Sequence, residues 1–87
     1  MEPAPLTELR LRPGDRVRFQ HAPGGRWHEG TVHRRERDGS VALHETGNGA
    51  ARAIAADRLH VLTGDGRKAR WEPVVARAAR PEQLSLL

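Results

Sequence analysis

The chain contains no cysteine and no tyrosine, and its only aromatic residues are two tryptophans and one phenylalanine. Without cysteine, neither a disulfide framework nor a thiolate zinc site can stabilise so small a protein. The 87 residues leave room for one compact domain with a modest core, because a small domain buries a smaller share of its surface than a large one. Ordinary hydrophobic packing must therefore hold the fold together.

Long apolar stretches are also missing. No run is long enough to cross a bilayer, and Met1 to Pro5 does not begin the basic-then-apolar pattern of a secretory signal. We therefore expect a cytoplasmic protein, with nucleoid association as an option. Lysine is nearly absent too, since Lys68 is the only one among 15 basic residues. Because arginine-rich usage beside abundant alanine and glycine is typical of a GC-rich bacterial genome, the formal charge of +4 permits phosphate contacts without indicating them.

Short alternating segments predict strands. In residues 16–20 apolar and polar side chains alternate, which places Val17 and Phe19 on one face of a half-buried strand. Residues 27–35 alternate in the same way and direct Trp27 to the opposite, outer face. These two segments predict the first half of a small sheet.

Turn residues predict how the sheet continues. Asp38-Gly39 is a strong hairpin signal and should pair the strand before it antiparallel with the strand after it. The later segments are strands over 41–43, 51–55 and 60–62 and a helical turn over 56–59. About five short strands with short connections are typical of a small barrel.

Four strings of this region resemble the SH3-like barrels of the KOW and Tudor type. The strings are Pro13-Gly14-Asp15-Arg16-Val17-Arg18-Phe19, Gly30-Thr31-Val32, Asp38-Gly39-Ser40-Val41 and Ala56-Asp57-Arg58-Leu59. The resemblance covers residues 9–62 and implies a mostly β, five-stranded SH3-like barrel. It does not imply a ligand, because this barrel hosts unrelated functions.

The sequence after the barrel predicts a short C-terminal helix and a tail. Pro73 suits the first turn of a helix and Pro81 ends it, and we expect the helix to pack on the barrel through Trp71, Val74 and Val75. The expected divisions are an N-terminal extension over 1–8, the barrel over 9–62, a basic linker or mobile loop over 63–70, the helix over 71–80 and the tail over 81–87.

The tail contains the most informative motif. Gln83-Leu84-Ser85-Leu86-Leu87 resembles the bacterial sliding-clamp-binding motif, whose pattern is Gln, Leu, Ser or Asp, Leu, and a final Phe or Leu. The resemblance implies that Gln83 fixes the register through hydrogen bonds, that Leu86 and Leu87 fill an apolar pocket, that Leu84 adds a lesser contact and that Ser85 tolerates Asp. It also implies weaker binding than a Phe-ended tail would give.

A partner explains why an exposed end carries leucines, since apolar side chains gain nothing there unless something buries them. The alternative is that Leu84, Leu86 and Leu87 fold back onto the barrel as an added edge strand. Both interpretations hold if the tail is docked on its own barrel until the clamp competes for it.

The expected function is that of a non-enzymatic adaptor. It would bind the bacterial DNA sliding clamp, the β subunit of DNA polymerase III, in DNA replication or repair, while the barrel engages a second partner such as DNA or a repair protein. One alternative is a nucleic-acid-binding KOW-like module with a structural tail, and another is a protein-interacting barrel unrelated to DNA. The candidate nucleic-acid-binding residues are Arg34, Arg35, Arg37, Arg67, Lys68 and Arg70, and the candidate partner surface is Trp27.

The other candidate sites are weaker. With no cysteine and no evident carboxylate cluster, and with His28 and His33 on opposite faces of one strand, we expect solvated histidines, no metal and no cofactor. The five histidines are His21, His28, His33, His44 and His60. No nucleophile with a base and an orienting group can be assigned, so we do not expect an enzyme.

Overall fold

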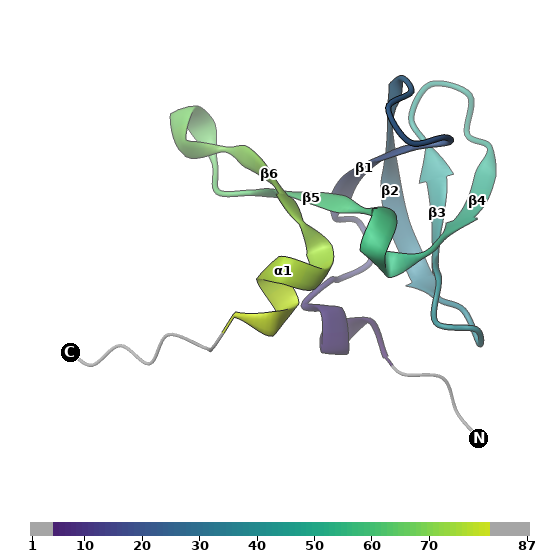
Figure 1. Ribbon diagram of the computed structural model, residues 1–87, viewed down its shortest axis with the longest axis horizontal. Coiled ribbons are helices and arrows are strands. Elements are labelled where there is room, and N and C mark those ends of the chain that lie inside the picture. The colour runs from purple at the N-terminus through teal and green to yellow at the C-terminus, as the bar shows by residue number, and fades with distance from the viewer. Residues whose placement is uncertain (1–4, 81–87) are drawn as a thin grey trace.

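The computed structural model describes residues 5–80 of the protein, which form a mostly β domain with one short α-helix (Figure 1). The strands are β1 (Arg16–Gln20), β2 (Trp27–Arg35), β3 (Val41–Glu45), β4 (Ala51–Ile54), β5 (His60–Thr63) and β6 (Arg70–Pro73). The helices are α1 (Val74–Ala79) and the 3-10 turns η1 (Leu6–Leu9), η2 (Ala56–Arg58) and η3 (Gly66–Lys68).

All six strands belong to one antiparallel sheet in the order β4-β3-β2-β1-β5-β6. Within the part of the chain that the structure describes, β4 and β6 are the two edges and the sheet does not close between them. Figure 1 shows the β5–β6 hairpin extending away from the β2–β4 part of the sheet, with α1 beneath it. The fold is compatible with a small barrel-like domain, but it has six strands where the sequence predicted five.

The alternation of side chains located the first strands correctly. β1 and β2 have the predicted bounds, and β2 pairs antiparallel with β3 across the predicted turn, where Gly39 adopts a φ of 94°. Val17 and Phe19 are completely buried, as one face of β1 requires. The core comprises Leu9, Leu11, Val17, Phe19, Val32, Val41, Leu43, Ile54, Leu59, Val61 and Val74.

The segment 63–70, expected to be a linker or a loop, is the loop of a hairpin. Thr63 pairs with Arg70 and Leu62 with Trp71, so the segment joins β5 to β6. Gly64 makes this turn possible, because its φ is 84° and a Cβ there would lie 2.8 Å from the carbonyl oxygen of Lys68. Strand β6 was missed because it is short, charged and ends on a proline, which an edge strand tolerates.

The helix expected over 71–80 begins only at Val74, since the residues before it belong to β6. Val74 is completely buried, as expected, whereas Val75 is 41% exposed and the prediction that it packs on the barrel was wrong. The N-terminal segment covers the same end of the domain: the Arg77 guanidinium donates a hydrogen bond of 2.7 Å to the carbonyl oxygen of Arg10. Residues 6–8, assigned to an extension, thus lie in a turn that belongs to the folded unit, and Leu9 at its end is buried.

Candidate functional site

The predicted clamp-binding residues Gln83, Leu84, Ser85, Leu86 and Leu87 lie outside the residues that the structure describes. Their role stays a prediction from sequence. The buried apolar core of the described domain is built from residues between Leu9 and Val74.

The six candidate nucleic-acid-binding residues fall into two groups. Arg34, Arg35 and Arg37 lie around the β2–β3 turn, whereas Arg67, Lys68 and Arg70 lie around the β5–β6 turn. The two turns lie at opposite ends of the domain in Figure 1, at lower right and upper left. The structure does not bring the two groups onto one surface.

Arg34 and Arg35 have different surroundings although they are neighbours. The Arg35 side chain is only 12% exposed, and its guanidinium donates hydrogen bonds to the carbonyl oxygens of Gly39 at 2.6 Å and Pro5 at 3.2 Å. Arg34 is 66% exposed and pairs with Glu36 at 3.2 Å. Arg35 therefore connects the hairpin to the N-terminal segment through hydrogen bonds, and Arg34 is the member of this pair that a ligand can reach.

Trp27 lies on the outer face of the sheet and is 43% exposed, as the strand pattern predicted. Arg18 and His60 contact the Trp27 ring, and Trp71 in turn contacts Arg18. The guanidinium carbon of Arg18 lies 4.1 Å from the ring centre of Trp27 and 5.0 Å from that of Trp71, and the His60 ring meets Trp27 edge-on at 5.1 Å. We call Arg18, Trp27, His60 and Trp71 the tryptophan surface.

The alternation of side chains along the strands explains why these four residues share one face, because each occupies an outward position, on β1, β2, β5 or β6. Arg18 also pairs directly with His60 across β1 and β5. Burial, and then the charge of Arg18, lower the pKa of His60, so the imidazole is neutral at neutral pH and does not repel the guanidinium. Among residues 5–80, Arg18 Nε and His60 Nδ1 are buried without a hydrogen-bond partner. The surface thus combines the exposed aromatic area of Trp27 with a guanidinium stacked on its ring.

A second cluster lies on the inner face, at the end of the sheet where β1 ends and β3 ends. The His28 Nδ1 atom lies 3.5 Å from Glu45 Oε1, and the His21 Nε2 atom lies 3.8 Å from Glu45 Oε2. The Arg52 side chain donates a hydrogen bond of 2.5 Å to Glu45 Oε2. We call His21, His28 and Glu45 the histidine–glutamate cluster.

Glu45 is the most buried member of this cluster, with its side chain 7% exposed. The hydrogen bond from Arg52 is the main reason that the pKa of Glu45 lies below its usual value; burial opposes it, and the charges of Arg52, His28 and His21 add to it. Glu45 is thus an anion that the Arg52 guanidinium stabilises.

A glycine stands opposite Glu45 where β2 and β3 approach closely. Gly30 on β2 pairs with Glu45 on β3, and a Cβ on Gly30 would lie 2.7 Å from both the His44 carbonyl oxygen and Leu43 Cδ1. Only a residue without a side chain fits between the strands at this register.

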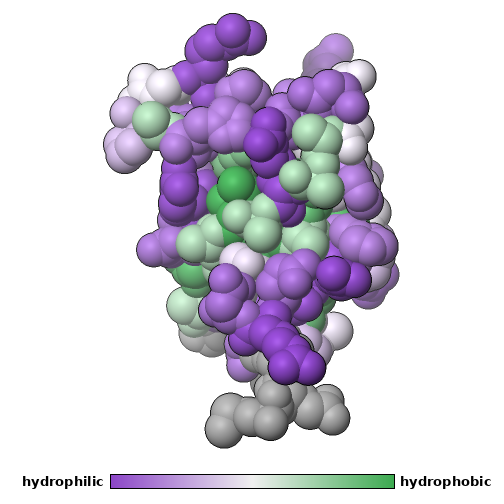
Figure 2. All heavy atoms as spheres, turned by 90° about the vertical axis from the view of Figure 1, so that its right-hand side faces the viewer, coloured by the Kyte–Doolittle hydropathy of each residue, from purple (hydrophilic) through white to green (hydrophobic). Residues whose placement is uncertain are grey.

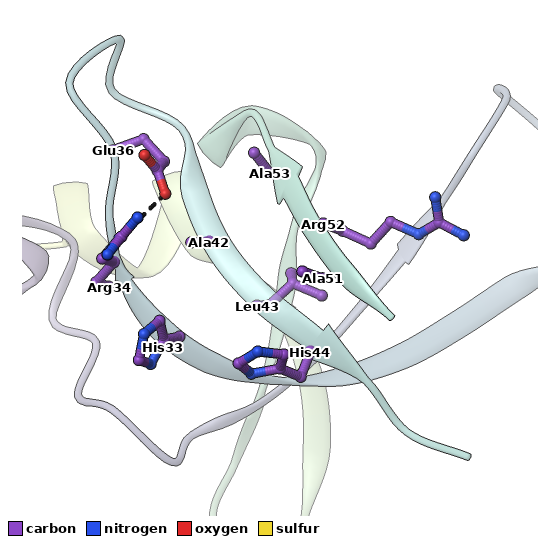
Figure 3. A pocket seen from close by; sticks show the side chains of 9 residues that line it. All are labelled: His33, Arg34, Glu36, Ala42, Leu43, His44, Ala51, Arg52 and Ala53. Carbon is purple, nitrogen blue, oxygen red and sulfur yellow. Dashed lines mark hydrogen bonds and ion pairs between the residues drawn. The ribbon is translucent and has the colours of Figure 1, made fainter. Parts of the chain in front are cut away.

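The outer face of β2, β3 and β4 carries a shallow groove of about 390 Å³. Figure 3 shows His33 and His44 side by side at its floor, with their ring centres 5.3 Å apart, and Arg34 paired with Glu36 at its margin. Figure 2 views the molecule from the β4 side and shows apolar side chains in the middle of a polar surround. The groove is lined by His33, Arg34, Glu36, Ala42, Leu43, His44, Ala51, Arg52 and Ala53.

Sequence reasoning missed two parts of these sites. Trp71 was assigned to a helix, so its place beside Arg18 was not foreseen. Glu45 was not recognised, although it has the same parity as the buried Val41 and Leu43. A carboxylate on an otherwise apolar strand face was the available signal, because burying a charge is unfavourable unless it is paired.

Comparison of the chain with protein-family models, with curated proteins and with solved structures finds no match. In the described part of the chain, no helix has the length and apolar character needed to span a bilayer. The functional argument therefore depends on the residues of this chain alone.

Proposed function

We propose that the protein is a non-enzymatic adaptor that binds the bacterial DNA sliding clamp through Gln83 to Leu87, in DNA replication or repair. The single observation that carries this proposal is the match of all five residues, Gln83-Leu84-Ser85-Leu86-Leu87, to the clamp-binding pattern. We further propose that the antiparallel β domain is an SH3-like barrel of the KOW and Tudor type.

The chemistry of the peptide suits such a role. Leu86 and Leu87 are large aliphatic side chains that gain free energy when a partner removes them from water. The Gln83 amide carries both donors and an acceptor, so it can fix the register of a bound peptide through hydrogen bonds. A few anchor residues commonly supply most of the binding free energy of an interface, so a pentapeptide is long enough to bind a partner.

Two features of the described residues support an adaptor. Among the described residues, apolar side chains between Leu9 and Val74 form one buried core, so an adaptor would have a folded domain beside its peptide. The tryptophan surface offers a second place where a partner can bind. The nucleic-acid alternative gains no such support, because the two groups of basic residues lie at opposite ends of the domain.

Calorimetry with a purified bacterial sliding clamp tests the proposal. We expect the full chain to bind, and the double variant Leu86→Ala/Leu87→Ala to lose about 2 kcal/mol or more of binding free energy, a loss of affinity of at least about 30-fold. Ser85→Asp is the matched control within the same peptide, because the motif accepts either residue, and it should bind as the wild type does. Leu87→Phe should bind more tightly, since a larger ring adds buried area.

The contradicting results are equally specific. If the full chain shows no clamp binding, or if the double alanine variant binds as tightly as the wild type, the match of the pentapeptide is a coincidence. Circular dichroism of the same variants should show an unchanged domain, which separates loss of binding from loss of folding.

A further inference from the structure

We propose that the histidine–glutamate cluster is a binding site for a divalent transition-metal ion such as Zn²⁺. The site would use His21 Nε2, His28 Nδ1 and one carboxylate oxygen of Glu45. This inference goes beyond the proposed function and does not depend on it. It also reverses the expectation from sequence that the histidines are simply solvated, because folding unites residues that the sequence keeps apart.

The geometry of the three residues carries the proposal. The three ligand atoms all lie within 4.8 Å of one another, with separations of 3.5 Å and 3.8 Å from the carboxylate to His28 and His21. Zinc bonds to nitrogen and oxygen are about 2.0–2.2 Å long, so two ligands of a tetrahedral ion lie about 3.4 Å apart. The 3.5 Å separation is to Glu45 Oε1 and the 3.8 Å separation is to Glu45 Oε2, so a shared oxygen requires the exposed His21 side chain to move closer to Oε1.

The fold holds two of the ligands from different strands on one face. Phe19 pairs with His28 across β1 and β2, and its buried ring stacks on the His28 ring at 5.7 Å. Glu45 is fixed by the pairing of β3 with β2, and its backbone N–H donates to the carbonyl oxygen of Ala50 at 2.8 Å. Ligands supported by packing and backbone hydrogen bonds need little reorganisation when an ion binds.

The third ligand follows directly after β1 and closes the site toward solvent. The Arg58 guanidinium donates a hydrogen bond of 2.8 Å to the carbonyl oxygen of His21, which restrains the backbone there. The His21 ring meets Phe19 edge-on at 5.3 Å and lies 4.2 Å from the His28 ring. Its side chain is 44% exposed, so an ion can enter and water can fill a remaining coordination position.

The donor set defines the class of ion. Two imidazole nitrogens and one carboxylate oxygen suit zinc, cobalt, nickel and copper, whereas magnesium and calcium prefer oxygen ligands only. Three protein ligands leave at least one position open, which is typical of sites whose ion also contacts water or a ligand.

Arg52 opposes the ion. Its guanidinium holds Glu45 Oε2 at 2.5 Å and brings a positive charge beside the site, while Oε1 faces His28. The ion must therefore bind against a like charge or displace the Arg52 side chain, which is 42% exposed and can move into solvent. Removal of this side chain should therefore strengthen metal binding.

Titration of the untagged full chain with ZnCl₂ by calorimetry, and with Co²⁺ by visible absorption, tests the site. We expect one Zn²⁺ per chain and cobalt bands of a low-coordinate nitrogen and oxygen site. His21→Ala changes an exposed residue and should reduce affinity at least about ten- to 100-fold, because even partners outside the first coordination shell have effects of that size. Arg52→Ala should increase affinity.

The second histidine pair provides a matched control. His33 and His44 are also neighbours, with ring centres 5.3 Å apart on the outer face, but no carboxylate completes a metal-ligand group with them among the described residues. The double variant His33→Ala/His44→Ala should bind Zn²⁺ like the wild type. The proposal is overturned if the wild type binds no Zn²⁺ at micromolar concentration, if His21→Ala leaves the affinity unchanged, or if the His33 and His44 variant is the one that loses binding.

Discussion

Gly30 is the residue at which a single added methyl group should disturb both the sheet and the inner-face cluster. In most strands glycine is the weaker choice, and alanine in its place stabilises by roughly 0.5–1 kcal/mol. At Gly30 the added Cβ would lie 2.7 Å from the His44 carbonyl oxygen and 2.7 Å from Leu43 Cδ1, well inside van der Waals contact. Neither atom can yield easily, because one belongs to a paired strand and the other to a side chain that is 1% exposed.

We therefore expect Gly30→Ala to destabilise the protein by about 1–3 kcal/mol, the usual range for overpacking a well-packed core. For a domain of this size each kcal/mol lowers the melting temperature by about 4–8 °C, which thermal denaturation followed by circular dichroism resolves easily. The neighbouring Thr31→Ala removes atoms at an exposed position of the same strand and should change stability by less than about 1 kcal/mol. An unchanged or raised melting temperature for Gly30→Ala would refute the close approach of β2 and β3 at this register.

Two further predictions concern charged residues whose own side chains are largely buried, Glu72 and Arg35. Burial is the largest influence on Glu72 and raises its pKa, but the hydrogen bond and the charge of Arg80 outweigh it, so the pKa lies below its usual 4.5. The ion pair between Glu72 and Arg80 therefore stabilises the fold above about pH 4.5, and this stabilisation is lost as the pH falls through the folded pKa. Between about pH 5 and pH 3, the melting temperature of Glu72→Gln should fall less than that of the wild type. Arg35→Ala should lower the free energy of unfolding, measured by urea denaturation, by about 1–3 kcal/mol, because it removes the hydrogen bonds of a nearly buried guanidinium. The exposed Arg34→Ala should change it by less than about 0.5 kcal/mol. Equal effects would contradict the structural role assigned to Arg35.

The strands that could be predicted from the sequence are those in which one rule acts alone. β1 and β2 alternate cleanly between a buried and an exposed face, and Asp38-Gly39 specifies the turn after them, so their bounds and their antiparallel neighbour followed. β6 has no such pattern. Its four residues gain their place from pairing with β5 and from the turn that Gly64 permits, and pairing between segments is not visible in local alternation.

For the candidate sites too, properties of a single strand could be predicted, whereas contacts between strands could not. The outward direction of Trp27 is a property of its own strand and could be predicted, but its contacts with Arg18 and His60 require the order of the strands in the sheet. Because β1 lies between β2 and β5, side chains that are far apart in sequence become neighbours on the outer face. Residue composition alone cannot give that order.

Glu45 shows why an exception to a strand pattern is informative. Its parity directs it inward after two buried apolar residues, and a buried carboxylate is unfavourable unless cations or hydrogen-bond donors compensate. Here Arg52 supplies one compensating charge, and two histidines supply groups that can either carry protons or hold an ion. If only the stability of the sheet mattered, an apolar residue paired with Gly30 would serve better. A carboxylate, two imidazoles and a partly exposed arginine meet at one rim of the core, and this combination of donors is what the proposed ion site rests on.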